Sequence, residues 1–259
     1  MSRYATLSGV NKKLGEGWGT VNGIYRNLGT GFVTQSGVWK KCFSAGLALA
    51  NLPENSLLSI NENGAPVLFR IGKHDYESNI NGAGRVLMVR KDLWPDKMEW
   101  NSITLNAYAE SSVDTWLNGT YKGIFDGRVQ SLMGSTAFWY TEGGHSYKEH
   151  ESGSTLTTLS RPVFLLSYTE FGKNVGKGSN VEGSALPIAS SIQTGNANIQ
   201  WTRTIYWDDE DPSYYALAIG SSGLSSVRTR YLVRPAFTIP NTATVNPEPN
   251  ADGSYTLLV

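Results

Sequence analysis

The stretch 200–238 constrains the fold most, because it reads as strands on either side of one aromatic and acidic segment. Along 214–219, Tyr, Leu and Ile alternate with Tyr and Ala, which is the period of a strand with two distinct faces. Val233, Pro235 and Phe237 alternate in the same way. Because Pro235 has no amide hydrogen to donate to a ladder, we expect this strand to lie at a sheet edge or to end soon after it.

The segment between these strands is dense in Tyr, Trp, Asp and Ser. Tyr and Trp offer a large rigid contact area at low entropic cost, and Ser and Asp offer adaptable hydrogen bonds. This composition is typical of a recognition surface. We therefore predict a ligand-binding surface, with no catalytic role, formed by Tyr206, Trp207, Asp208, Asp209, Asp211, Ser213, Tyr214 and Tyr215.

Residues 1–50 carry an internal repeat. Gly9, Gly23 and Gly37 are spaced 14 residues apart, each after Ser or Asn and before Val or Ile. Such a step between short alternating runs is a hairpin signal, because glycine accepts a positive φ without a clash. Three units predict a small β-meander that packs on a neighbour or on copies of itself. A plain β-rich decoration of the larger domain is the alternative to a separate module for attachment or oligomerisation.

A larger domain is predicted over residues 51–240, followed by a C-terminal tail over 241–259. The runs 66–71 and 85–90 predict strands, and the continuous apolar run 163–166 predicts a strand covered on both sides. Four glycines and few apolar residues in 173–183 predict a mobile surface loop.

Two short helices are predicted in this domain. Ser112 is the expected N-cap of the first helix, which should end near Gly119. Asp126 is the expected N-cap of the second helix, whose buried face is Val129, Leu132 and Met133. Short helices beside several strands predict an α+β fold.

Composition excludes several classes of protein. Lys plus Arg and Asp plus Glu both total 22, so no net field favours nucleic acid or an anionic membrane. The single Cys42 excludes an intrachain disulfide scaffold. The N-terminus lacks the apolar core of a signal peptide and no run approaches membrane-spanning length, so we expect neither secretory export nor membrane insertion.

Three sequence blocks, in this order, resemble a family of lectin-like domains from gut bacteria and their prophages. They are 112–119, 162–167, and 201–204 followed by 233–236. The family has the C-type-lectin-like fold related to the formylglycine-generating enzyme type, which implies short helices around a small mixed or antiparallel sheet with long loops. The resemblance covers roughly residues 55–240. It departs from the family pattern at Gln200, where an aromatic residue is usual, and at Thr204, which replaces Ser.

The resemblance implies a receptor-binding protein rather than an enzyme. The group includes variable proteins diversified by retroelements, whose substitutions cluster near the C-terminus of a rigid scaffold. The repeat of residues 1–50 also resembles hairpin modules in tail proteins of phages that infect Gram-positive bacteria. We therefore expect a phage or prophage tail-tip adhesin that binds a bacterial surface protein or glycan, located on the virion tail or outside the cell after lysis. Trimerisation would add avidity to weak single contacts.

Four further residues are expected to be structural. Trp116 and Trp201 could be ligand platforms, but an aromatic residue on a helical or strand face is more often part of the core. Arg203 and Arg234 lie inside apolar strands, and a structural ion pair or backbone clamp explains them better than a ligand contact does.

Metal and enzyme functions have weaker support. The acidic run 208–211 could bind Ca²⁺, but its spacing is irregular and a solvated loop is the commoner explanation, so no cofactor is expected. His145 and His150 lack the spacing of a helical metal-binding pair. No nucleophile elbow, Walker loop or Cys-x-x-Cys motif is present. A purely structural tail or surface component, and a glycan hydrolase with an Asp/Glu pair, remain as alternatives.

Overall fold

The computed structural model contains residues 1–259, and it confirms the predicted α+β class: most elements are strands in several sheets, with a few short helices. The description that follows omits 1–3, 8–9, 14–17, 22–23, 28–29, 36–37, 45, 144–154, 177–178, 194–197, 207–213 and 221–222. Within 4–44 it covers the backbone of the strands only.

The N-terminal repeat forms three antiparallel hairpins, as the glycine spacing predicts. Two residues connect the strands of each hairpin. The predicted continuous meander is wrong, because each repeat contains both strands of one hairpin and the ladder closes within it. The strands are β1 (Tyr4–Leu7), β2 (Val10–Lys13), β3 (Trp18–Val21), β4 (Ile24–Asn27), β5 (Thr30–Gln35) and β6 (Val38–Ser44).

An eight-stranded sheet organises the rest of the chain, in the order β14-β19-β10-β9-β8-β21-β20-β7. Neighbouring strands are antiparallel except β21 and β8, which are parallel. The segment predicted as a C-terminal tail supplies β20 and β21, so it is part of this sheet. The strands are β7 (Leu47–Ala48), β8 (Leu57–Glu62), β9 (Ala65–His74), β10 (Arg85–Arg90), β14 (Val163–Leu165), β19 (Pro235–Pro240), β20 (Thr244–Val245) and β21 (Tyr255–Leu258).

The predicted edge position of the strand at Pro235 is wrong. This strand, β19, lies inside the sheet between β14 and β10. Pro235 is its first residue, opposite Leu165. A proline at the first position of a strand is compatible with an interior strand, and the ladder continues through Ala236 and Phe237.

Three smaller sheets complete the fold. They are β11 (Met98–Glu99) with β18 (Arg230–Tyr231), β12 (Thr136–Thr141) with β13 (Leu156–Arg161), and β15 (Gln200–Tyr206) with β16 (Tyr215–Ile219) and β17 (Leu224–Ser226). The alternation along 214–219 predicts two distinct faces, but residues 216–219 of β16 are all buried. The strand is therefore covered on both faces.

The first predicted helix begins one residue earlier than expected. The N-cap is Ser111, whose hydroxyl accepts a hydrogen bond from the amide of Asp114 at 3.1 Å. Gly119 does not end the helix, because a π-helical turn continues through it. Asp126 caps the second helix as predicted, accepting from the amides of Arg128 and Val129. The helices are η1 (Leu49–Asn51), α1 (Ser78–Asn81), η2 (Tyr108–Glu110), α2 (Ser112–Trp116), η3 (Leu117–Tyr121), α3 (Gly127–Leu132) and α5 (Ala189–Ile192).

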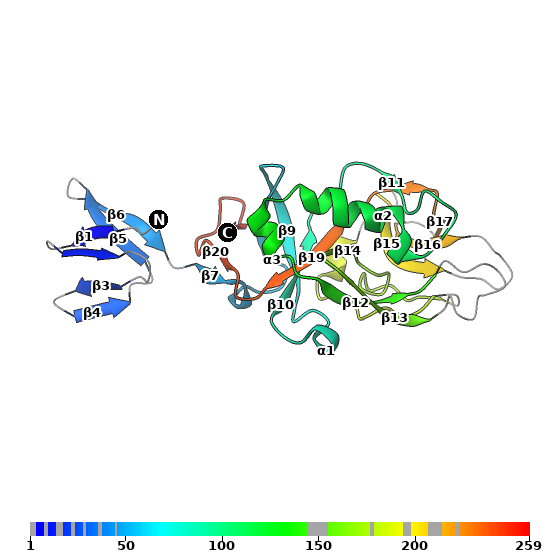
Figure 1. The fold of residues 1–259 in the computed structure, drawn as a ribbon, viewed down its shortest axis with the longest axis horizontal. Helices are drawn as coiled ribbons and strands as arrows, with labels where there is room; N and C mark the ends of the chain where they lie inside the picture. Colours follow the sequence, from blue (N-terminus) through cyan, green and yellow to red (C-terminus); the bar gives the residue numbers. More distant parts are fainter. Residues whose placement is uncertain are drawn as a thin grey trace.

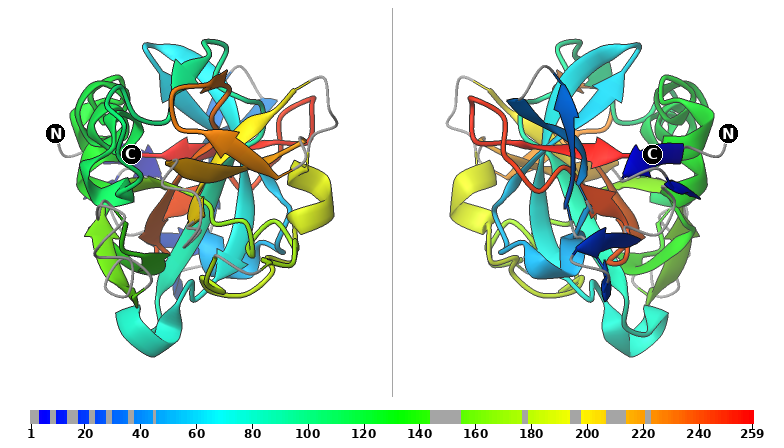
Figure 2. Two further views of the ribbon diagram at one scale, coloured as in Figure 1. Left: turned by 90° about the vertical axis from the view of Figure 1, so that its right-hand side faces the viewer. Right: turned by 90° about the vertical axis from the view of Figure 1, so that its left-hand side faces the viewer.

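The core lies between the large sheet and the helices of 108–132. Phe69 and Phe237 of the sheet have ring centroids 5.2 Å apart, and they pack against Phe125 at 6.2 and 5.7 Å, respectively. Figure 1 shows the N-terminal hairpins next to β7 and β20. Strands β12, β13, β15 and β16 lie at the opposite end of the molecule. In the left view of Figure 2, which is seen from that end, β15–β17 lie in front of the sheet and the helices of 108–132 (green) lie to one side. Across the described residues, the helices are all too short or too polar to span a membrane.

Candidate functional site

Arg203 lies in the middle of β15 with its side chain completely buried. Its Nη1 donates to Glu170 Oε2 at 2.7 Å and to the carbonyl of Leu165 at 2.9 Å. Its Nε donates to the carbonyl of Trp139 at 2.9 Å, and its guanidinium lies 4.7 Å from the ring centroid of Phe138. A buried cation is tolerated only when such partners replace its water.

Glu182 is a second carboxylate on the same arginine. Its Oε2 lies 3.7 Å from Arg203 Nε and accepts from the hydroxyl of Thr204 at 2.8 Å. Its Oε1 accepts from the amide of Thr141 at 2.8 Å. Burial raises the pKa of Glu182, and Arg203 and these hydrogen bonds oppose the rise. Glu182 falls in the segment 173–183, predicted as a surface loop, yet it is fully buried.

Glu170 connects Arg203 to a third segment. The phenol of Tyr76 donates to Glu170 Oε1 at 2.5 Å, and the amide of Ser167 donates to Oε2 at 2.7 Å. Burial, and next the charge of Glu170, raise the pKa of Tyr76 well above its usual value, so the phenol remains a neutral donor. We call Arg203, Glu170, Glu182 and Tyr76 the Arg203 network. This network connects three segments of the chain, those that contain Tyr76, Trp139 and Glu182, to strand β15.

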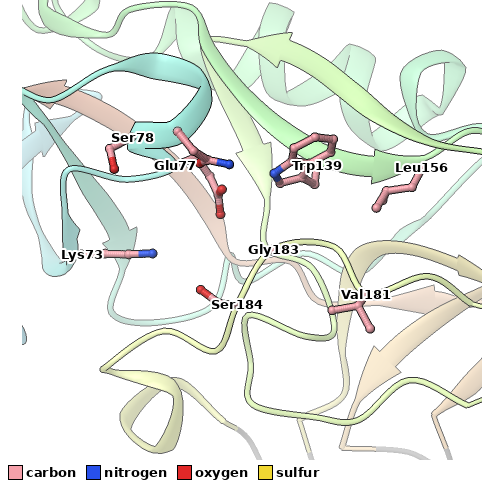
Figure 3. Close-up of a pocket in the computed structure, with 9 residues that line it drawn as sticks. Lys73, Glu77, Ser78, Trp139, Leu156, Val181, Gly183 and Ser184 are labelled. Atoms are coloured by element: carbon pink, nitrogen blue, oxygen red, sulfur yellow. The ribbon is translucent and has the colours of Figure 1, made fainter.

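These three segments surround a hollow of about 400 Å³, which we call the Glu77 hollow. Glu77 follows Tyr76 and Gly183 follows Glu182, and both line it together with Trp139. Figure 3 shows its two sides, with Lys73, Glu77 and Ser184 on one side and Trp139, Leu156 and Val181 on the other.

Glu77 is held in an unusual conformation. Its backbone is left-handed, with φ 47° and ψ 48°, which costs a non-glycine residue about 1 kcal/mol or more. Asn81 fixes the turn: its side-chain amide donates to the carbonyl of Ala137 and its carbonyl oxygen accepts from the amide of Ala137, both at 2.8 Å. Across the hollow, Gly183 has φ +81°, and a Cβ there would lie 2.9 Å from Glu77 Oε1. The strained Glu77 therefore faces a glycine, which adopts its positive φ without a steric penalty.

Glu77 is 8% exposed as a whole residue, and its carboxylate has no hydrogen bond or ion pair with any residue that the structure describes. Burial raises its pKa, followed by repulsion from Glu170, while Lys73 lowers it. Because Glu77 lines the hollow, water or a ligand there can supply the donor that the described protein does not. Sequence reasoning missed this residue, because its isolation arises only when three distant segments meet.

The predicted binding surface is described only at its two ends. Tyr206 is the last residue of β15, and Tyr214 and Tyr215 lie beside it at the start of β16; all three are half-buried. The rings of Tyr206 and Tyr215 lie 6.4 Å apart at 74°. We call these three residues the tyrosine end. Trp207, Asp208, Asp209, Asp211 and Ser213 lie outside the described residues, as do Glu210, His145 and His150.

Besides Arg203, two more of the residues expected to be structural are buried. Trp201 is 1% exposed; its indole donates to the carbonyl of Met98 at 3.0 Å and packs on Tyr231 at 4.7 Å. Arg234 donates to the backbone carbonyls of residues 90 and 91 and, at 3.1 Å, to Gln200 Oε1. Its burial lowers its pKa to about 10.

Trp116 is the exception among these residues, because it is only half-buried. Its ring packs on Trp94 and Tyr121, each at 5.3 Å between centroids. It also lines two neighbouring hollows of about 490 and 520 Å³ on the face of α2. It therefore contacts both the core and solvent.

Within the part of the chain that the structure describes, no group of three or more His, Cys, Asp or Glu side chains could hold a metal ion. Among the described residues that line the Glu77 hollow, Glu77 is the one carboxylate, whereas Glu170 is fully buried in the Arg203 network. The described lining of the hollow therefore does not place two free carboxylates beside one bond of a substrate.

Residues 83–241 match the family described as Domain of unknown function (DUF6273). This match covers more than half of the chain, so the protein belongs to that family. It includes Arg203, Glu170, Glu182 and Trp139, and it begins after Lys73 and Glu77. No curated protein and no solved structure matches this chain.

Proposed function

We propose that this protein is a ligand-binding protein with a C-type-lectin-like domain, which recognises a bacterial surface protein or glycan. The recognition surface is formed by 206–215, and the protein acts as a phage or prophage tail-tip adhesin. The proposal rests on the sequence resemblance together with the position of the tyrosine end.

One observation carries the proposal. Residues 200–205 of β15 are all buried, whereas Tyr206, Tyr214 and Tyr215 at the adjoining strand ends are half-buried. The segment between Tyr206 and Tyr214 therefore starts and finishes on a base fixed by Trp201 and Arg203. A rigid base lowers the entropy lost on binding, which favours recognition by the side chains it presents.

The N-terminal hairpins are consistent with attachment to a larger assembly. In this proposal they anchor the chain, and a trimer presents three copies of 206–215 together. Avidity then raises the binding of weak individual contacts without any new contact. The protein would act on the virion tail or outside the cell after lysis.

The test compares two variants of the full-length protein in binding to whole bacterial cells and to extracted envelope. The first replaces Tyr206, Trp207 and Tyr214 by Ala. The control is Tyr255→Ala, a half-buried tyrosine on β21 in the large sheet. We expect the first variant to lose cell binding with a nearly unchanged melting temperature, and the control to bind normally.

Two outcomes would contradict the proposal. Normal cell binding by the triple variant would remove 206–215 from the recognition surface, and a large loss of stability would make these rings part of the core. If the unmodified protein binds no bacterial envelope, a purely structural component is favoured. Turnover of envelope glycans would favour the hydrolase instead.

A further inference from the structure

The Glu77 hollow has an acceptor that the described protein does not satisfy. Glu77 is nine-tenths buried as a residue, and its carboxylate faces the hollow and has no donor among the described side chains and amides. Its position is imposed by the left-handed turn at Glu77 and by the bond between Tyr76 and Glu170. A built position of this kind points to a ligand that brings a donor with it.

The two sides of the hollow differ in chemistry. Lys73 and Ser184 accompany Glu77 on the polar side, as Figure 3 shows. The opposite side is apolar: Leu156 is 40% exposed and Val181 is 59% exposed, next to the half-buried ring of Trp139. Large apolar side chains this exposed in a concave site favour an apolar partner.

The charges of the polar side are complementary to a pair of opposite charges on one ligand. Lys73 and Glu77 both line the hollow, and they do not form an ion pair with each other. A neutral saccharide could pack on Trp139 but would leave both charges without counterions. A ligand with one ammonium and one carboxylate would pair both.

We propose that the Glu77 hollow binds a free α-amino acid with a large apolar side chain. Its ammonium is held by Glu77 and lies within reach of the ring of Trp139. Its carboxylate is held by Lys73, and its side chain lies against Leu156 and Val181. Tyr206, Tyr214 and Tyr215 are not among the described residues that line this hollow.

Gly183 preserves the space that this ligand needs. A Cβ at that position would lie 2.9 Å from Glu77 Oε1, on the side where the ammonium is bound. The Arg203 network holds the rest of the frame, because it anchors Trp139 through its carbonyl and Gly183 through the neighbouring Glu182. The described part of the site is therefore a product of the fold.

The experiment is isothermal titration calorimetry of the full-length protein with three probes. They are L-phenylalanine, N-acetyl-L-phenylalanine, which lacks the ammonium, and 2-phenylethylamine, which lacks the carboxylate. We expect L-phenylalanine to bind and each of the other two to bind about tenfold or more weakly. Binding of L-phenylalanine should also weaken as the pH falls and Glu77 becomes protonated.

Variants identify the two charged contacts. We expect Glu77→Gln to weaken both L-phenylalanine and 2-phenylethylamine, and Lys73→Met to weaken L-phenylalanine alone. Glu110→Gln, at an exposed carboxylate elsewhere, should change neither. If Glu77→Gln proves unstable, the probe series on the unmodified protein and Lys73→Met still decide the matter.

Three results would overturn the proposal. They are no binding of L-phenylalanine up to about 10 mM, equal binding of the N-acetylated probe, and normal binding by a folded Glu77→Gln variant. Because no bacterial envelope is present, these results are independent of recognition through 206–215.

Discussion

The two parts of β15 differ in what surrounds them. Along 200–205 every side chain is buried, whereas Tyr206 and its neighbours Tyr214 and Tyr215 are half-buried. A substitution in the first part removes contacts on which the fold depends, and one in the second removes contacts that a partner could use. Stability and recognition should therefore separate over a few residues of one strand.

The largest effect is expected at Arg203. Arg203→Met would leave Glu170 and Glu182 buried without their cation, and losing one partner of a buried pair costs about 3–5 kcal/mol. Denaturant unfolding measures this loss. The control is Arg128→Met, since the pair of Arg128 with Asp126 is exposed and should contribute less than about 1 kcal/mol. A loss at Arg203 as small as that at Arg128 would contradict the structural role of the network.

The next effect concerns Thr204, beside Arg203. Its hydroxyl donates to Glu182 at 2.8 Å and accepts from the amide of Tyr168 at 2.9 Å. Thr204→Val removes both bonds inside the fold, and we expect a loss of about 1–3 kcal/mol in unfolding free energy. Thr204→Ser keeps the hydroxyl and should lose less. Equal losses in the two variants would show that the methyl group, not the hydroxyl, matters.

Because of Glu182, the free energy of unfolding should depend on pH. Because burial raises its pKa in the folded state, the folded protein binds this proton more tightly than the unfolded chain does. The resulting stability is present below the unfolded pKa of about 4.3 and is lost as the pH rises through the folded pKa. Glu182→Gln should reduce this fall in unfolding free energy, by about 1.4 kcal/mol for each unit of pKa shift. An unchanged pH profile would mean that Glu182 is ionised at no cost.

The smallest effect on stability is expected at the tyrosine end. Tyr215→Ala removes a half-buried ring and its contact with Tyr206, so we expect a loss of about 1 kcal/mol or less. Thermal unfolding, compared with Trp201→Ala at about 3–5 kcal/mol, checks the contrast within one hairpin. Comparable losses would remove the distinction between the two parts of β15.

Local sequence patterns predict much of the fold. The glycine spacing predicts the three hairpins, and Asp126 predicts the cap of α3, because both depend on neighbouring residues. Predictions failed where distant segments decide the outcome. Pro235 is tolerated inside the sheet because it begins its strand, and residues 241–259 become strands because β8 and β7 offer them partners.

The sequence predicts the burial of Arg203 but does not identify the partners in the Arg203 network. An arginine in an apolar strand indicates buried partners, but nothing in the spacing of Glu170 or Glu182 identifies them. Glu182 lies in a glycine-rich run whose composition predicts a surface loop. Its burial follows from Arg203 and Thr204 on β15, which no local pattern can reveal. Glu77 was missed for the same reason.

Hydrogen–deuterium exchange of the full-length protein, with and without extracted bacterial envelope, tests the central claim most directly. Peptides from 200–205 should be strongly protected in both states, and the peptide spanning 206–215 should gain protection only when envelope is added. Rapid exchange along 200–205 in the free protein, or no change along 206–215 on adding envelope, would contradict a rigid base that presents a recognition surface.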